Sequence, residues 1–130
     1  MLWKLKCFQL HLDSKVPKFN LEVETIKNDN YRKVIDTTKN MQLVLMSLMP
    51  LEDIPEETHP KTSQFFRVEK GVIQIIVNDK KKILKDGQSL IVPPNTKHYV
   101  KCVGKQSAKL YTIYTPPEHP DGLIQKVKPN

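Results

Sequence analysis

Four side chains with oxygen or nitrogen donor atoms occupy two short segments of the chain: Glu57, His59 and Gln64 in the first, and His98 in the second. In an extended segment, side chains two residues apart share a face, so Glu57 and His59 are expected on one side. Gln64 begins an apolar strand, and His98 follows a proline turn. A small barrel could bring these donors together as a metal cradle. The alternative is that the first segment is only the polar entry to a core strand.

The elements around these residues are predicted to be short strands joined by turns. No segment of any length shows the 3.6-residue period of a helix, and residues 51–63 are predicted to form a long loop. In the strand that begins at Gln64, alternation places Phe66 and Val68 on the same inward face, and Arg67 on the opposite face. Strand patterns occur at 41–49, 64–69, 72–77, 89–92, 98–103 and 108–115. They predict an all-β barrel or sandwich.

The N-terminal part of the chain has weaker patterns. Residues 2–12 alternate apolar and polar side chains with a phase slip between Cys7 and Phe8, which is typical of two strand halves that meet at a bulge. A weak strand is predicted from Phe19 to Ile26. We therefore expect residues 1–27 to form a strand extension that packs on the barrel or on a dimer partner, and residues 28–130 to form the barrel itself.

Composition and charge exclude several classes of protein. A chain of 130 residues with ten prolines and four glycines indicates about one domain with many chain reversals. The net charge of +7 comes from scattered lysines. The one run, Lys80 to Lys82, is predicted in a hairpin turn, so we expect solvated surface rather than nucleic-acid binding. Neither a disulfide framework, a signal peptide nor a membrane span is indicated, and an intracellular, cytoplasmic protein is expected.

The first segment resembles the first of two conserved motifs of the cupin superfamily. That motif carries two histidines, a glutamate and a closing glycine at fixed spacing. Counting back from Gly71 in "EETHPKTSQFFRVEKG", six residues lead to Gln64 at the glutamate position. Four more lead to His59 at the second histidine, and Glu57 stands at the first. Leu51 stands where the family has its leading glycine.

The second segment, "DGQSLIVPPNTKHYVKC", resembles the second cupin motif. Gly87, Pro93 and His98 stand at the required spacing. Asn95 replaces the middle glycine, a mild change because asparagine is the commonest other residue in a left-handed turn. Cys102 replaces the closing asparagine and is expected to pack as a small apolar side chain.

The resemblance covers residues 28–124 and includes "NYRKVIDTTKNMQLVLMSL" and "KLYTIYTPPEHPDG". These stretches are similar to small single-domain cupins described as mannose-6-phosphate isomerase-like. The resemblance implies a cupin double-stranded β-helix, a jelly-roll barrel of two antiparallel sheets. It also implies a homodimer, since strands of this superfamily often pair across a dimer and an exposed edge strand needs cover.

The family's metal site implies Glu57, His59, Gln64 and His98 as the ligands of one divalent ion. Two imidazoles, a carboxylate and an amide oxygen favour Mn, Fe, Ni or Zn over copper(I). Glutamine in place of a carboxylate removes one negative charge, which should weaken binding and leave the metal more Lewis acidic. Glu57 could instead act as a base on bound water.

Each ligand assignment has a plainer alternative. Glu57 could decorate a solvated turn, His59 could be a loop histidine, and Gln64 could hydrogen-bond a loop backbone. His98 could be a satisfied turn histidine. His119, in "PPEHPDG", could close over the barrel mouth or lie on a surface loop.

Two functions remain open from the sequence. The first is a metal-dependent enzyme that acts on a small polar or sugar-like molecule, with isomerase chemistry implied by resemblance only. Against a phosphorylated substrate, the chain offers no arginine cluster, and Arg67 is predicted to point away from the site. The second is a non-catalytic module that binds a small ligand, or a cupin whose metal site is vestigial. Fold does not fix the chemistry.

Overall fold

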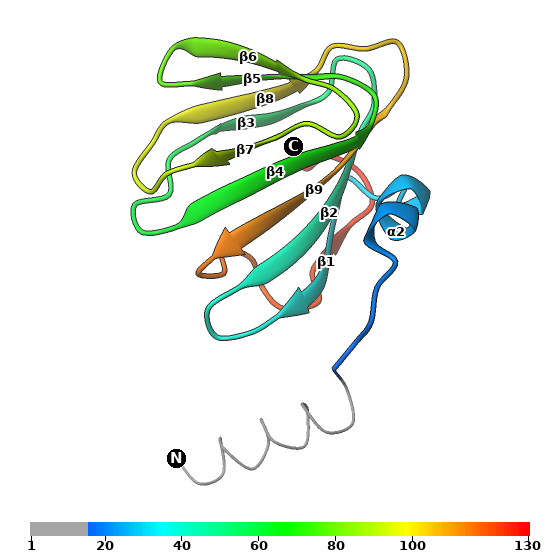
Figure 1. Ribbon diagram of the computed structural model, residues 1–130, viewed down its shortest axis with the longest axis vertical. Helices are drawn as coiled ribbons and strands as arrows, with labels where there is room; N and C mark the ends of the chain where they lie inside the picture. The colour runs from blue at the N-terminus through cyan, green and yellow to red at the C-terminus, as the bar shows by residue number, and fades with distance from the viewer. Residues whose placement is uncertain (1–15) are drawn as a thin grey trace, which may run out of the picture.

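Ten strands and one short helix make up residues 16–130, the part of the chain described by the structure, which is a computed structural model (Figure 1). The helix is α2 (Leu21–Lys27). The strands are β1 (Arg32–Thr37), β2 (Gln42–Leu48), β3 (Asp53–Glu57), β4 (Ser63–Lys70), β5 (Ile73–Val77), β6 (Lys80–Leu84), β7 (Ser89–Val92), β8 (His98–Cys102), β9 (Ala108–Thr115) and β10 (Ile124–Gln125). Within these residues, no helix is long and apolar enough to cross a membrane.

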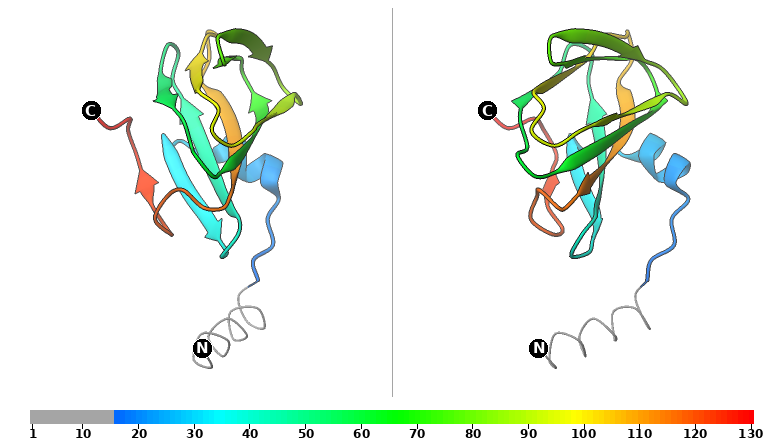
Figure 2. Two further views of the ribbon diagram at one scale, coloured as in Figure 1. Left: turned by 90° about the vertical axis from the view of Figure 1, so that its left-hand side faces the viewer. Right: turned by 60° about the vertical axis from the view of Figure 1, so that its left-hand side comes forward.

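The strands form two antiparallel sheets that face each other (Figures 1 and 2). The larger sheet has the order β10-β1-β2-β9-β4-β7, and the smaller has the order β3-β8-β5-β6. Neighbours in both sheets are often distant in sequence, as in the pairs of β2 with β9 and β3 with β8. This two-sheet antiparallel barrel confirms the predicted all-β jelly roll.

Alternating side chains of both sheets fill the space between them. The larger sheet contributes Val44, Met46, Phe66 and Leu110, and the smaller contributes Ile75, Val100 and other side chains, each fully buried. At roughly 1.5–3 kcal/mol for each fully buried large apolar side chain, this core is the main source of stability. Leu45 and Ile113 do not belong to this core, because they alternate along β2 and β9 with side chains that point into it. They lie on the other face of the larger sheet, where Leu45 is nevertheless buried.

The predicted strand from Phe19 to Ile26 is wrong, because residues 21–27 form α2. Its start is set by Asn20, whose side chain accepts a hydrogen bond from Val23 N at 3.4 Å. Acidic residues lie in its first turn and Lys27 in its last, as the helix dipole favours. The helix packs beside β4 and β9. The strand predicted for residues 2–12 lies outside the described residues.

The predicted loop from 51 to 63 is also wrong in part, because Asp53–Glu57 form β3. Pro55 has no backbone N–H for a strand hydrogen bond, and for that reason a loop was predicted for this segment. β3 lies at the edge of the smaller sheet, and its pairing with β8 is irregular between Ile54 and Glu57, around the proline. An edge position with a bulge is where a sheet tolerates proline.

Several turns depend on left-handed backbone geometry. The β5–β6 hairpin turns at Asn78 and Asp79, with φ of 47° and 66°. The lysine run predicted in that turn therefore lies in strand β6, where its side chains are exposed. Asn95 has φ of 57°, which confirms the left-handed turn expected there. Gly71 has φ of 87°, and a Cβ there would lie 2.9 Å from the Cα of Ala108, so only glycine fits without a shift.

Candidate metal centre

Three strands bring the predicted donors together near one end of the barrel. Glu57 ends β3 and pairs with His98, the first residue of β8. Gln64 is the second residue of β4, in the facing sheet, and its side chain points inward. His59 lies in the short segment that joins β3 to β4. The carbonyl oxygen of His59 accepts a hydrogen bond from Asn95 N at 2.7 Å, so the two motif loops hold each other.

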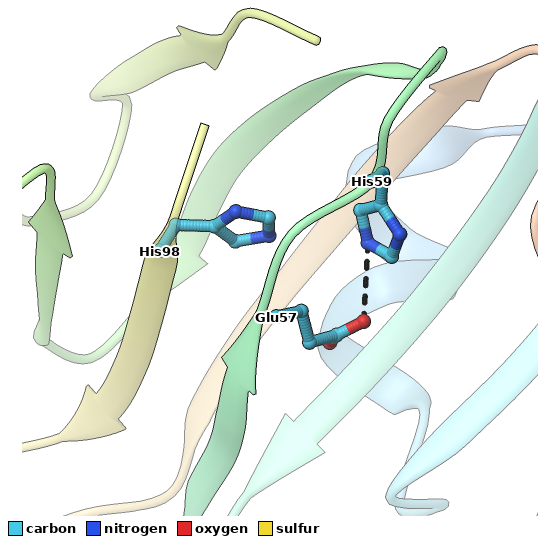
Figure 3. A group of neighbouring side chains, drawn as sticks. All are labelled: Glu57, His59 and His98. Atoms are coloured by element: carbon cyan, nitrogen blue, oxygen red, sulfur yellow. Dashed lines mark ion pairs between the residues drawn. The ribbon is translucent and has the colours of Figure 1, made fainter. Parts of the chain in front are cut away.

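Glu57, His59 and His98 turn their side chains toward one another (Figure 3). Each offers one ligand atom, and these atoms all lie within 4.8 Å of one another. Two ligands each about 2.1 Å from a metal lie roughly 3–4 Å apart. The three side chains therefore need only a small adjustment to bind one ion.

The hydrogen bonds of His98 fix which ring nitrogen faces this cluster. Nδ1 lies 2.9 Å from the carbonyl oxygen of Thr96, which can only accept, so Nδ1 carries the proton. In a neutral ring, Nε2 then presents a lone pair, and it lies 3.1 Å from the amide oxygen of Gln64. The Gln64 amide nitrogen is turned away and donates to Thr112 Oγ1 at 2.9 Å. Two buried acceptors thus face each other, and a cation bound by both removes their repulsion.

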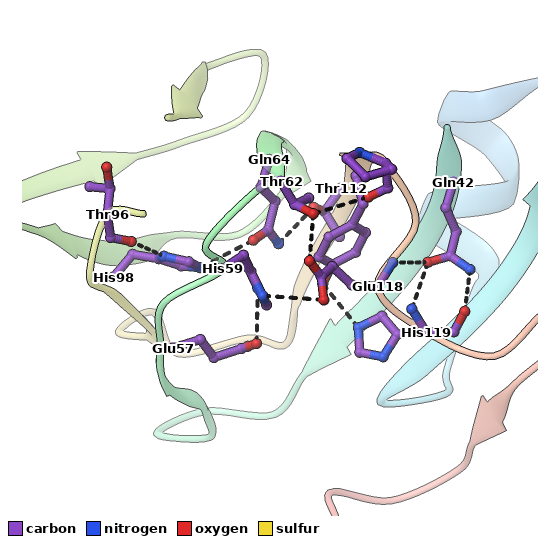
Figure 4. A network of polar contacts seen from close by, with 12 residues as sticks. Gln42, Glu57, His59, Thr62, Gln64, Thr96, His98, Thr112, Glu118 and His119 are labelled. Carbon is purple, nitrogen blue, oxygen red and sulfur yellow. Dashed lines mark hydrogen bonds and ion pairs between the residues drawn. The ribbon is translucent and has the colours of Figure 1, made fainter. Parts of the chain in front are cut away.

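His59 is oriented by two carboxylates (Figure 4). Its Nε2 lies 3.1 Å from Glu57 Oε2, and its Nδ1 lies 3.6 Å from Glu118 Oε2. The Nε2 atom is buried and makes no well-formed hydrogen bond within residues 16–130. A histidine that ligates a metal through one nitrogen usually directs its other N–H toward a carboxylate, and Glu118 is placed for that.

Glu118 belongs to a loop that the barrel holds over the site. Its Oε1 accepts a hydrogen bond from Thr62 Oγ1 at 2.5 Å. The buried side chain of Gln42 accepts from the backbone N–H groups of Glu118 and His119, at 3.2 and 3.0 Å. Its amide donates to the His119 carbonyl oxygen at 2.7 Å (Figure 4). The loop that carries His119 is thus held against the barrel by Gln42, and the structure places His119 in the wall of a pocket beside Glu57.

Tyr114 and His119 form an adjoining pair. Tyr114 is fully buried, and its hydroxyl lies 3.2 Å from His119 Nε2. The ring of Tyr114 also meets the ring of His59 edge-on, with centroids 5.8 Å apart. Burial raises the pKa of Tyr114, and the charge of Glu57 adds to this effect. Tyr114 is therefore a neutral hydrogen-bonding group at neutral pH.

His119 is expected to make the folded protein less stable in acid. Burial, with smaller contributions from the charges of Arg32 and His59, lowers the pKa of His119 from 6.5 to about 4. The unfolded chain binds that proton more readily, so the stabilising contribution is complete above about pH 6.5 and is lost as pH falls toward 4. We expect the His119→Gln variant to lose less unfolding free energy than the wild type over this range, as measured by urea denaturation. Equal slopes in both proteins would contradict the prediction.

The second prediction concerns Glu118. If this carboxylate orients His59 as a ligand, the Glu118→Gln variant should bind divalent metal roughly 10- to 100-fold more weakly, with little change in the fold. Calorimetric titration of the metal-free protein measures this. Asp121→Asn, in the same loop, is the matched control and should leave the affinity unchanged. Equal affinity in Glu118→Gln and the wild type would show that Glu118 does not support the centre.

The sequence-predicted donors are all in this one region. Glu57, His59 and His98 form the cluster, and Gln64 contacts His98. The predicted outward direction of Arg67 is confirmed, since it forms an ion pair with Glu69 on the other side of β4. Cys102 is fully buried, as predicted. That the four donors bind a metal stays a prediction.

Several residues of this region were not predicted from the sequence. Glu118, Gln42 and Tyr114 surround the cluster, and Arg32 lies nearby in β1. The prolines that flank Glu118 and His119 are a signal for a rigid loop and could have pointed to Glu118. Nothing in a single sequence shows that Gln42 or Arg32 lies near residues 57–64.

Comparisons with known proteins identify the family and the fold of the chain. Residues 44–114 match the family model described as a cupin domain. The chain is 43% identical over 114 residues to uncharacterized protein L612 of Acanthamoeba polyphaga mimivirus, which covers 85% of this chain and 71% of L612. It is 36% identical over 115 residues to uncharacterized protein YrkC of Bacillus subtilis strain 168. That alignment covers 84% of this chain and 62% of YrkC.

A solved structure shows the same fold. The crystal structure of BH2720 from Bacillus halodurans superposes with a TM-score of 0.84 at 33% identity, over 87% of this chain and 90% of that one. The family model, the relatives and the two-sheet barrel all lead to one assignment. This chain belongs to the cupin family.

Proposed function

We propose that this chain is a metal-dependent cupin that holds one divalent transition metal and acts on a small polar molecule. The ligands are Glu57, His59, Gln64 and His98, and the metal is Mn, Fe, Ni or Zn. One observation supports this above all. Ligand atoms of two imidazoles, a carboxylate and an amide converge in a partly buried space, where His98 Nε2 and the Gln64 amide oxygen face each other as two acceptors.

The chain's own residues support catalysis around such a centre. A bound divalent ion supplies Lewis acidity, which polarises a carbonyl or hydroxyl oxygen of a substrate. Glu118 holds His59 in place, and the Gln42 contacts hold the loop that carries Glu118. Tyr114 and His119 provide a hydrogen-bonding edge beside the donors. If Glu57 is not a ligand, its carboxylate is placed to act as a base on bound water.

The resemblance implies a more specific function, isomerase chemistry on a phosphorylated sugar. The site residues give it little support, because phosphate recognition usually employs several donors and Arg32 is the one arginine near the site. The proposed substrate is therefore a small polar molecule.

A non-catalytic module is the second candidate. A half-turn of the Gln64 amide would let its nitrogen donate to His98 Nε2, so the side chains can also satisfy each other without a cation. A barrel that holds a small ligand without turnover would need no more.

We also propose a homodimer, on the basis of resemblance, and sedimentation of the full chain over a range of concentrations tests it.

Metal titration tests the proposal. The full chain, treated with a chelator, is titrated with Mn, Fe, Ni and Zn ions while thermal unfolding is followed. A ligand at 100 times its dissociation constant stabilises the folded state by about 2.7 kcal/mol, which raises Tm by roughly 10 °C. We expect such a shift for at least one of these metals, with one ion per chain by elemental analysis. No shift and no bound ion with any of them would rule out the metal centre and leave the non-catalytic candidate.

A further inference from the structure

A pocket of about 250 Å³ opens beside the donor cluster. Glu57 lies in its wall, so a molecule in this pocket is next to the metal centre proposed above. Arg32, Tyr31, His119 and Lys128 also line it. They come from β1 and the residue before it, from the loop after β9 and from the C-terminal segment, so the pocket brings together segments far apart in sequence.

Arg32 is the unusual residue of this pocket. Its side chain is only 8% exposed. Its Nη1 donates to Gln125 Oε1 at 2.5 Å, and its Cζ lies 5.2 Å from the centre of the Tyr31 ring. The Nε atom is buried and has no hydrogen-bond partner within residues 16–130. Among those residues, no carboxylate forms an ion pair with Arg32, although Arg67, the other arginine, has one.

A buried guanidinium with a free donor is costly in the absence of a partner. Charged side chains are rarely buried unless they are paired, and a buried donor without an acceptor costs the free energy of its lost hydration. Gln125 and the Tyr31 ring compensate part of this cost, but neither carries a negative charge. An acceptor that enters the pocket would supply the partner that Arg32 lacks among residues 16–130.

The charges around the pocket indicate the sign of that partner. Lys128 is already paired with Asp53, which also accepts a hydrogen bond from Tyr99 at 2.6 Å. His119 is uncharged at neutral pH because burial lowers its pKa to about 4. With a divalent ion in place, the carboxylates of Glu57 and Glu118 balance the ion. The charge of Arg32 is then in excess, and an anion would balance it.

We propose that Arg32 binds the carboxylate of a small substrate, whose neighbouring oxygen reaches the metal. This assignment rests on the proposed metal centre and names the substrate class for it. A carboxylate fits better than a phosphate because one guanidinium edge is already used by Gln125 and the Nε–H is the free donor. The pocket volume of about 250 Å³ suits a molecule of a few carbon atoms.

Calorimetric titration of the metal-loaded full chain tests this proposal. The probes are glycolate, lactate and pyruvate, their uncharged amides, and inorganic phosphate. The variants are Arg32→Gln, Arg32→Lys and, as the matched control, Arg67→Gln, which removes the same charge from the outer side of β4. A hydrogen bond to a charged group is worth about 1.5–3 kcal/mol, so Arg32→Gln should bind the carboxylate roughly 10- to 100-fold more weakly. Arg67→Gln should bind it as the wild type does.

Two further comparisons separate the donor from the charge. Arg32→Lys keeps the charge without the Nε–H and should bind with an intermediate affinity; it also keeps the test decisive if Arg32→Gln does not fold. Each carboxylate should bind at least about 10-fold better than its amide, as expected for a charge-assisted contact. Equal binding of acid and amide, equal binding by Arg32→Gln and wild type, no carboxylate binding at millimolar concentration, or tighter binding of phosphate would each overturn the proposal.

Failure of the metal centre and failure of this pocket give different results. Elemental analysis of each variant reports metal content independently of the probes, and Arg32→Gln should retain the full wild-type content. If the wild type holds no metal, the same titration on the metal-free chain still decides the role of Arg32. A carboxylate signal that Arg32→Gln loses there upholds the anion pocket without the metal, and its absence overturns the pocket as well.

Discussion

Replacement of His98 with alanine is expected to lower the affinity for a divalent metal at least about 100-fold, more than the loss of a residue that only supports a ligand. His98 Nε2 is the donor whose direction is most firmly set. Its Nδ1–H donates to the Thr96 carbonyl oxygen, and its side chain is 3% exposed. Alanine removes that donor completely. Calorimetric titration with the best-bound metal and elemental analysis of the purified chain both measure the loss.

The matched control is the neighbouring residue. Lys97→Ala changes an exposed side chain on the same turn, whose ion pair within residues 16–130 is with the exposed Asp79. It should keep wild-type affinity. Because His98→Ala also removes a buried side chain, a circular dichroism melt of the variant is needed to show that it folds. A folded His98→Ala protein with unchanged metal content would remove His98 from the centre.

Two substitutions of Gln64 are expected to change the metal affinity strongly and in opposite directions. Gln64→Glu has nearly the same shape and places a negative charge where the amide oxygen now lies, 3.1 Å from His98 Nε2. More ligand charge strengthens binding of a divalent ion, so the affinity should rise by about 10- to 100-fold. The price is a less stable metal-free protein, because the new carboxylate is buried in the barrel.

Gln64→Leu is the counterpart that keeps the volume and removes the oxygen. If Gln64 is a ligand, this variant should bind metal more weakly than the wild type, while Gln64→Glu binds more tightly. If Gln64 serves only as a hydrogen-bond partner of His98 and Thr112, Gln64→Leu should change stability and leave metal affinity unaltered. The pair of variants therefore separates the two roles left open by the sequence.

The strands and the two motif turns could be predicted from the sequence because their signals are local. Alternation in 64–69 correctly placed Gln64 inward and Arg67 outward. The left-handed backbone at Asn95 followed from its place in the second motif. These features depend on neighbours within a few residues, which a single sequence displays directly.

The errors have physical causes of two kinds. α2 alternates apolar and polar side chains as a strand does, and its cap residue, Asn20, is a weaker signal than that alternation. In β3, Pro55 has no backbone N–H to donate to a neighbouring strand, so the sequence predicted a loop there. An edge strand tolerates this loss, because it pairs with a neighbour on one side only. Local patterns conflicted in both segments, and the tertiary position decided the outcome.

The surroundings of the site could not be predicted, for a different reason. Gln42, Arg32 and Glu118 reach the donors only because β1, β2 and the loop after β9 lie together in the barrel. Their position beside residues 57–64 depends on contacts between distant parts of the chain. Thr62 and Glu118, for example, form a hydrogen bond although they are more than 50 residues apart in sequence. No spacing rule within one sequence contains that information.

An anomalous-difference map from crystals grown with Mn or Zn ions tests the central claim most directly. Data collected on both sides of the metal's absorption edge report its identity and its position together. We predict one peak per chain, bounded by Glu57, His59 Nε2, Gln64 Oε1 and His98 Nε2. The account is contradicted if the metal lies elsewhere on the protein, or if crystals at saturating metal show these four side chains with no ion between them.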